Sequence, residues 1–294
     1  MRQSAVVLIA AFCLASVEPA AQSKPALEQI LEKMATYLRD YESQLSSVVA
    51  DEVFNQRVVA TRAYSGGLPK TETIRRRLES EIGFIRLPGG EAWLGFRDVR
   101  KKDGRALKTQ ARSVGDVLAS GADTLSQARA VAEASAEHNL GVPRTTNVPT
   151  AALDIIHPDH YAAHRFVLRG EDMIQRTRAA VVEFVETARP TLVNDPGGQD
   201  LISRGRIWVD PASGAVWRIE WIYKADERFA TAAPQSSLRV DFAPNEALGM
   251  MVPQEMREVF AAFDGLEARG DGVATYRNFR RFGTSARIVP QEQR

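Results

Sequence analysis

The alternation of apolar and polar residues in the second half of the chain constrains the fold most strongly. Between residues 215 and 224, apolar side chains occupy every second position from Trp217 to Tyr223. A period of two is that of a half-buried β-strand, so we expect this half to form a sheet. Segments with this pattern, or with strand-like composition between turn residues, are 73–87, 92–99, 165–169, 179–187, 204–210, 215–224, 237–242, 255–263 and 273–282.

Helical patterns precede and interrupt these strands. Apolar residues between Leu27 and Val48 recur at spacings of three and four, which predicts one apolar helix face. A second helix is expected over 127–140, with Ser126 as its N-cap. No linker-like composition divides the mature chain, so we predict a single α+β domain over 22–294. In it a strongly curved antiparallel sheet (a half-barrel) packs against the N-terminal helix, and residues 97–150 form a helical insertion.

The first 21 residues have the pattern of a secretory signal peptide. Arg2 precedes the uncharged apolar run Ala5–Ala15, which is too short to span a bilayer, and small residues follow up to Ala21. An apolar core helix is the alternative interpretation. We expect a periplasmic or secreted protein that is not an integral membrane protein after cleavage near Ala21.

Cysteine and charge content narrow the chemistry. Cys13 is the only cysteine and lies inside the apolar run. Lipidation would require a small residue before it, and Phe12 stands there. Removal of the signal peptide leaves no thiol for disulfides, catalysis or metal binding. The 38 basic and 37 acidic residues give a net charge of +1, which gives no reason to expect nucleic acid as a partner.

Searches for catalytic and metal-binding patterns find no convincing site. His157, His160 and His164 have helical spacing, but the segment before the next strand is short, so we expect a solvated polar turn and no metal. A Gly-x-Ser-x-Gly elbow and the glycine-rich phosphate motifs are absent from the sequence. Glu183 and Glu186 lie three apart on a strand and would face opposite sides. We expect no catalytic residues, no cofactor and no enzymatic activity; a hydrolase is the least favoured alternative.

The late strands and the turn between them carry aromatic and methionine side chains. A surface rich in Met and Trp adapts to apolar ligands of variable shape. We therefore predict that a lipid, acyl or other apolar group binds on one concave face of the sheet, while an ordinary core beneath the N-terminal helix is the alternative. The candidate ligand-binding residues are Trp217, Trp221, Tyr223, Phe242, Met250, Met251 and Met256.

Seven segments carry a family resemblance. They are Trp93–Val99, Asp103–Arg105, Asn139–Gly141, Arg144–Thr150, Arg189–Thr191, Gly205–Pro211 and Ala274–Phe282. Together they resemble a family of exported bacterial proteins, seen mainly in acidobacterial-type genomes and without an assigned activity. The resemblance spans nearly the whole mature chain and brings no catalytic residues with it. Within the fourth segment we expect Asn147 and Thr150 to bond their own backbone.

The second half also looks like the periplasmic lipoprotein-carrier architecture (LolA-like). The likeness covers the strands at 205–211, 217–223 and 274–282 and the Met250–Met256 step. It implies a curved antiparallel sheet that wraps helices and can hold acyl chains, with a lipoprotein as a partner. The insertion at 97–150 departs from this pattern and would cover a cavity. The alternative is an envelope protein–protein interaction module that uses sheet edges or the insertion.

Overall fold

The structure is a computed structural model that describes residues 26–46, 48–62, 70–86, 93–108, 113–141, 144, 146–194, 198–225, 236–262 and 268–282. The signal peptide and its cleavage site lie outside the described residues. The predicted N-terminal helix, the late strands and most of the insertion lie within them.

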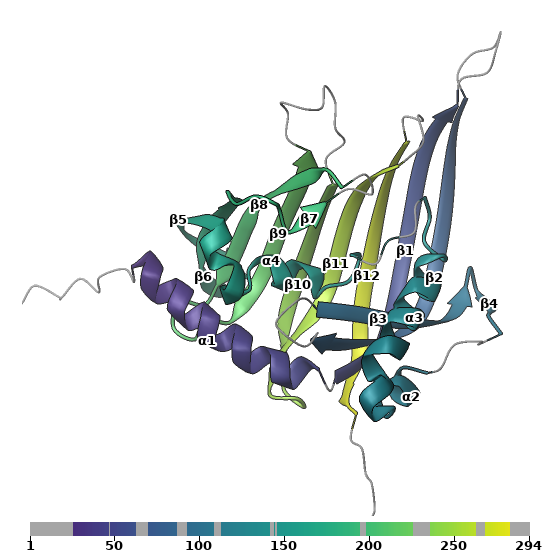
Figure 1. Ribbon diagram of the computed structural model, residues 1–294, viewed down its shortest axis with the longest axis horizontal. Helices are drawn as coiled ribbons and strands as arrows, with labels where there is room; N and C mark the ends of the chain where they lie inside the picture. The colour runs from purple at the N-terminus through teal and green to yellow at the C-terminus, as the bar shows by residue number, and fades with distance from the viewer. Residues whose placement is uncertain are drawn as a thin grey trace, which may run out of the picture.

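One antiparallel sheet of twelve strands forms the centre of the protein (Figure 1). Its order is β4-β3-β2-β1-β12-β11-β10-β9-β8-β6-β5, and β7 pairs with β8 beside this path. The first and last long strands are neighbours, so the two halves of the chain share one sheet, which remains open between β4 and β5. The strands are β1 (Val48–Arg62), β2 (Lys70–Arg86), β3 (Trp93–Lys102), β4 (Arg105–Ala106), β5 (His164–Ile174), β6 (Thr177–Glu186), β7 (Val193–Asn194), β8 (Asp200–Val209), β9 (Val216–Ala225), β10 (Ser236–Asn245), β11 (Met250–Ala262) and β12 (Ala268–Arg281).

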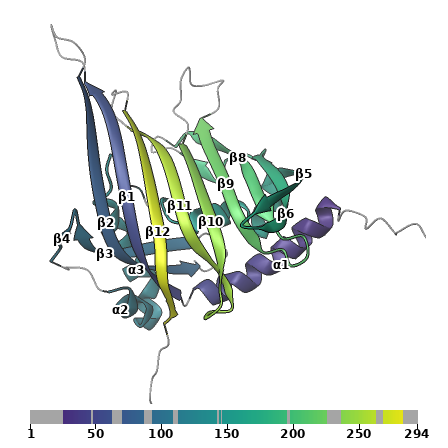
Figure 2. The ribbon, with the colours of Figure 1, turned by 180° about the vertical axis from the view of Figure 1, so that it is seen from behind.

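The helices gather on one side of this sheet. Figure 1 shows α1 running across the lower ends of the strands, with β3 crossing in front of β1 and β12, and Figure 2 shows the opposite face of the sheet without helices over it. The predicted α+β fold, with a curved antiparallel sheet and an N-terminal helix, is therefore confirmed. The helices are α1 (Leu27–Leu45), α2 (Val114–Leu118), α3 (Thr124–Ala136) and α4 (Ala151–Ile155), with the 3₁₀ helices η2 (Gly121–Asp123) and η3 (Pro158–Ala163).

The apolar face of α1 forms one wall of the main core. Ile30, Met34, Leu38, Tyr41 and Leu45 follow the predicted spacing and are buried. They pack with the apolar side chains of α4 and of the sheet face toward α1. Burying such a side chain contributes roughly 1.5–3 kcal/mol, so this face anchors α1 to the sheet.

The helical insertion is present, with limits that differ from those predicted. β3 continues to Lys102 and turns at Asp103-Gly104 into β4, so the first part of the 97–150 region belongs to the sheet. Ser126 is not an N-cap, because α3 already begins at Thr124, directly after η2. The capping box found here belongs to α2, where Ser113 and Asp116 bond each other's backbone N–H. Side chains of α2 and α3 then pack around Phe96 of β3.

Candidate functional site

The seven candidate ligand-binding residues gather on or around the main core. Met256 is completely buried, and both Met250 and Met251 are 8% exposed. Tyr41 of α1 meets the ring of Phe242 edge-on, with 6.5 Å between the ring centroids. The strands therefore bring these residues together in or against the core, with α1 packed over them. Five of the seven (Trp221, Phe242, Met250, Met251 and Met256) are buried members of the core cluster, and Trp217 and Tyr223 are partly buried against it.

Trp217 departs from the simple alternation of β9. The pairing of β8 with β9 shifts at this point, so that Trp208 pairs with Arg218 while Val209 pairs with Val216. Trp217 is the extra residue of this bulge, and bulges re-aim side chains. Its ring packs against both the main core and a smaller cluster that contains Trp208 and Ile174. The sequence pattern does not reveal such a bulge.

A groove reaches the methionine end of this core from the solvent. It lies between α1 and the turns that join β8 to β9 and β10 to β11, and it has a volume of about 520 Å³. Met250 and Met251 line it from the sheet, and Tyr37 and Tyr41 line it from α1. The two tyrosine rings are stacked, with centroids 5.4 Å apart. The remaining lining residues are Glu32, Lys33, Thr36, Asp40, Gln44, Ser213 and Gly249.

The hydroxyls of the two tyrosines beside this groove are not satisfied by the described residues. Both hydroxyl oxygens are buried and lack a hydrogen-bond partner among the described residues. Burial raises the pKa of Tyr37 and Tyr41, so both keep their protons. A buried polar group without a partner costs about 1–3 kcal/mol.

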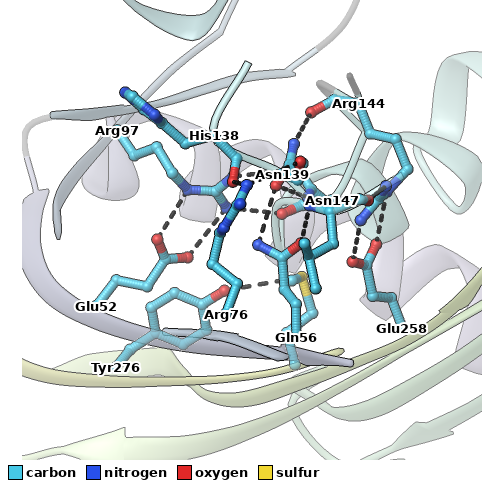
Figure 3. Close-up of polar contacts among 12 residues, drawn as sticks. Glu52, Gln56, Arg76, Arg97, His138, Asn139, Arg144, Asn147, Glu258 and Tyr276 are labelled. Atoms are coloured by element: carbon cyan, nitrogen blue, oxygen red, sulfur yellow. Dashed lines mark hydrogen bonds and ion pairs between the residues drawn. The ribbon is translucent and has the colours of Figure 1, made fainter. Parts of the chain in front are cut away.

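A buried polar network joins the insertion to the sheet at the other end of the molecule (Figure 3). Arg97 of β3 donates to both carboxylate oxygens of Glu52 on β1, at 2.8 and 3.0 Å, and both side chains are almost fully buried. Arg97 also donates to the side-chain oxygen of Asn147 at 3.1 Å and to its backbone carbonyl at 2.7 Å. The ion pair thus fixes the segment that precedes α4.

Side-chain amides extend this network along β1. Asn147 donates to Asn139 at 3.0 Å, and Gln56 donates to the same oxygen of Asn139 at 3.2 Å. Gln56 also accepts from the backbone N–H of Leu140 at 2.8 Å. The expectation that Asn147 bonds its own backbone is therefore wrong, because Arg97 of the sheet and Asn139 of the insertion are its side-chain partners. Thr150 is buried, and its hydroxyl has no partner among the described residues.

A second ion pair completes the attachment of the insertion. Arg144 donates to the two carboxylate oxygens of Glu258 on β11 at 2.7 and 3.3 Å. Its guanidinium carbon lies 3.6 Å from the ring centroid of Phe260, a cation–π contact. Arg144 also donates to the carbonyl of Leu140 at 2.8 Å. The charged groups of this network form ion pairs with one another, so we interpret the network as structural.

A different polar cluster lies beside α1, on the flank away from the groove. Glu42 Oε1 lies 2.6 Å from His157 Nε2 and 3.2 Å from Arg86 Nε. Arg86 donates to Asp154 at 2.6 Å, and the backbone N–H of Trp93 lies 2.9 Å from both oxygens of Asp154. Glu42 comes from α1, Arg86 from β2 and Asp154 from α4. The cluster therefore ties α1 to two other elements.

Burial controls the protonation of this cluster. It raises the pKa of Asp154 to about 7, although the Trp93 N–H and Arg86 oppose the shift. Burial, together with Arg86, lowers the pKa of His157 to about 4. The Nδ1 of His157 accepts from the backbone N–H of Asp159 at 3.3 Å. The neutral ring then carries its proton on Nε2, which faces Glu42.

The histidines therefore differ from the solvated turn that the sequence predicted. His157 and His164 are 5% and 8% exposed, because η3 packs this segment against α1 and the sheet. In the part of the chain that the structure describes, no three His, Cys, Asp or Glu side chains are arranged to hold a metal ion. None of the helices among the described residues has the length and apolar character needed to cross a membrane.

Sequence comparisons and structure comparisons give different results. No protein-family model matches the sequence, and no curated protein matches it significantly. Among solved structures, a DUF1329 family protein from Desulfovibrio piger matches with a TM-score of 0.34 and 13% identity, over 88% of this chain and 98% of that chain. A putative outer membrane lipoprotein-sorting protein domain from Vibrio parahaemolyticus matches with a TM-score of 0.33 and 11% identity, over 86% and 92% of the two chains.

The complex of MucA and MucB from Pseudomonas aeruginosa also matches, with a TM-score of 0.21 and 10% identity, over 85% of this chain and 99% of that one. A lipoprotein-sorting domain is thus among the solved structures that match this chain. The fold itself rests on the strand pairing of the chain.

Proposed function

We propose that this protein is an exported, non-enzymatic binding protein that holds the apolar part of a small amphipathic ligand, such as an acyl chain, in the groove beside α1. One observation carries the proposal: the groove connects the solvent with the methionine end of the predicted aromatic and methionine surface. Its volume of about 520 Å³ falls in the range of roughly 300–1,000 Å³ that is usual for small-molecule sites.

The lining of the groove suits a ligand with an apolar and a polar end. Met250 and Met251 offer flexible, polarisable side chains that adapt to an alkyl chain. Tyr37 and Tyr41 offer unsatisfied hydroxyls, and Asp40 lies at the exposed side of α1. The tail of the ligand would lie against the methionines, and an acceptor group would meet the tyrosines.

Two measurements test this function. Native mass spectrometry of the protein purified from a membrane-containing host, followed by organic extraction, is expected to reveal a bound lipid or acyl species. Binding of dansyl-labelled undecanoic acid is then followed by fluorescence in a pair of matched variants. Thr36→Trp fills the groove without removing a core side chain, whereas Gln29→Trp adds the same ring at an exposed position of α1 outside the groove.

We expect Thr36→Trp to raise the Kd for the labelled acid at least tenfold and Gln29→Trp to leave it near the wild-type value. Equal affinities in both variants would contradict a site in the groove. The substitution Trp221→Asp is a poor test, because Trp221 is only 2% exposed and a charge there would be buried without a partner.

A second candidate function is an envelope protein–protein interaction module. The observation that favours it is the filled core, since α1 and α4 already occupy the space against the sheet that an enclosed lipid would need. A bare mass in the native spectrum, together with no binding of the labelled acid, would favour this candidate. Capture of an envelope protein by the intact chain would then be the next experiment.

A further inference from the structure

The two flanks of α1 have different neighbours. On one flank, Glu42 contacts Arg86 and His157, and the Tyr161 hydroxyl donates to the carbonyl of Leu31 at 3.3 Å. The opposite flank borders the groove through residues such as Asp40. At 100° per residue, positions 40 and 42 lie about 200° apart around a helix. Glu42 therefore makes its contacts on the side of α1 opposite the groove.

The N-terminal half of α1 is fixed by a separate contact. Lys33 Nζ donates to the carbonyl of Pro211 in the turn between β8 and β9, at 2.9 Å. In the same turn, Gly214 lies so close to α1 that a β-carbon there would collide with the carbonyl of Lys33. A sideways movement of α1 would therefore turn about this point, and the C-terminal half of the helix would move most, with Leu38, Tyr41 and Leu45 sliding over the sheet face on which they are buried.

We propose that Glu42, Arg86, Asp154 and His157 form a latch that holds the C-terminal half of α1 against α4 and thereby keeps the groove open. The latch regulates the binding site described above, and in that respect it rests on the proposed function. When the latch is released, α1 turns about the contact between Lys33 and Gly214 and moves toward the turn between β10 and β11. The groove then narrows against Met250 and Met251.

The chemistry of the cluster supports a contact that can be made and broken. The groups that face it are Arg39 and Glu42 from α1, Arg86 from β2, Asp154 from α4, and His157, Asp159 and His160 from the η3 segment. With the latch made, Asp154 is neutral below pH 7 and His157 is neutral above pH 4. Burial raises the pKa of Glu42 and Arg86 opposes that shift, so Glu42 and Arg86 form the ion pair at the centre of the cluster. Such a pair is held by its geometry, because its desolvation offsets much of its attraction.

Spin labels across the groove test the latch directly. In the chain with Cys13→Ser, Asp40→Cys and Ala247→Cys place one label on α1 and one on the turn between β10 and β11, both at exposed positions. Double electron–electron resonance then gives the distance across the groove. We expect Glu42→Gln and His157→Gln each to shorten this distance. Glu28→Gln, which removes an exposed charge from α1 outside the latch, is expected to leave it unchanged.

Glutamine keeps the size of Glu42, and near-ultraviolet circular dichroism checks that both variants retain their packing. In folded variants, an unchanged distance would overturn the latch. The labelled fatty acid distinguishes this proposal from the proposed function. A shortened distance with a Kd raised at least fivefold supports both proposals. A shortened distance in a protein whose wild type does not bind the acid supports the latch and rejects the ligand.

Discussion

At the scale of single residues, a buried ion pair helps to hold the insertion on the sheet. Glu52 and Arg97 are 1% and 2% exposed, so each depends on the other for compensation. Replacing a whole buried ion pair by apolar residues is often harmless, whereas removal of one partner leaves a buried charge that nothing neutralises. The Asn139 and Asn147 amides around this pair add hydrogen bonds that define one docking position.

We predict that Arg97→Met destabilises the protein by about 3–5 kcal/mol, the usual cost of leaving one buried charge unpaired. Urea denaturation measures the change. The double variant Arg97→Met with Glu52→Gln should recover part of the loss, because it also removes the orphaned carboxylate. As a matched control, Arg169→Met breaks the exposed pair with Glu183 and should barely move the midpoint. Equal losses in the two single variants would contradict the role assigned to burial.

At the scale of elements, α1 is the piece whose attachment combines apolar and ionisable contacts. Its apolar stripe supplies most of the binding to the sheet, and Glu42 adds the contacts to His157 and Arg86. The pKa of Asp154 is raised above its ordinary value, and the pKa of His157 is lowered below its ordinary value. Their effects on stability therefore oppose each other as the pH changes.

The signs follow from proton uptake. The pKa of Asp154 is raised from 3.8 to about 7. Its contribution to the free energy of unfolding is therefore complete below pH 3.8 and is lost as the pH rises through 7. The pKa of His157 is lowered from 6.5 to about 4. Its contribution to the free energy of unfolding is therefore complete above pH 6.5 and is lost as the pH falls through 4. Between pH 4 and 6.5, the fall in stability due to Asp154 and the rise due to His157 largely cancel in the wild type as the pH increases.

We predict that Asp154→Asn and His157→Gln each leave only the pH dependence of stability that the other group contributes. Relative to the wild type, the Tm of Asp154→Asn should rise with pH between 4 and 6.5, because only the His157 contribution remains. The Tm of His157→Gln should fall over the same interval. Circular dichroism at several pH values gives both profiles. Two variants with profiles parallel to the wild type would show that these groups are not coupled to folding in this way.

At the scale of the whole molecule, the insertion is part of the core and not an appendage. Its segments supply partners for Arg97, Gln56 and Glu258 of the sheet, and its helices cover Phe96. Three of the segments that carried the family resemblance meet in this network, through Arg97, Asn139 and the stretch from Arg144 to Asn147.

We predict that deletion of residues 111–150 prevents cooperative folding, because it removes the hydrogen-bond partners that the insertion gives to those sheet side chains and exposes the second core cluster. Thermal unfolding followed by near-ultraviolet circular dichroism measures this. A cooperative transition near the wild-type temperature would mean that the insertion is an independent addition. A partner of the insertion is better sought with substitutions at its exposed positions than with the deletion.

The sequence predicted the elements that depend on neighbouring residues. The alternation around Trp221 and the helical spacing that begins at Leu27 reflect the repeat of each element, and both appear in the structure. The predicted helix was too long, because α1 ends at Leu45 and Val48 already begins β1. The same alternation explains why Trp221 and Tyr223 share a face. It predicts only which side a residue faces, and so it missed the bulge that re-aims Trp217.

The groove and the polar clusters were decided by the tertiary structure alone. Glu42 meets His157, and Arg144 meets Glu258, across more than a hundred residues of chain, and no local pattern encodes such distances. Tyr37 and Tyr41 belong to a helix face that the sequence marks only as apolar, and their hydroxyls matter only because α1 lies beside Met250 and Met251. Periodicity is a property of the local backbone, whereas a site is made where distant segments pack together.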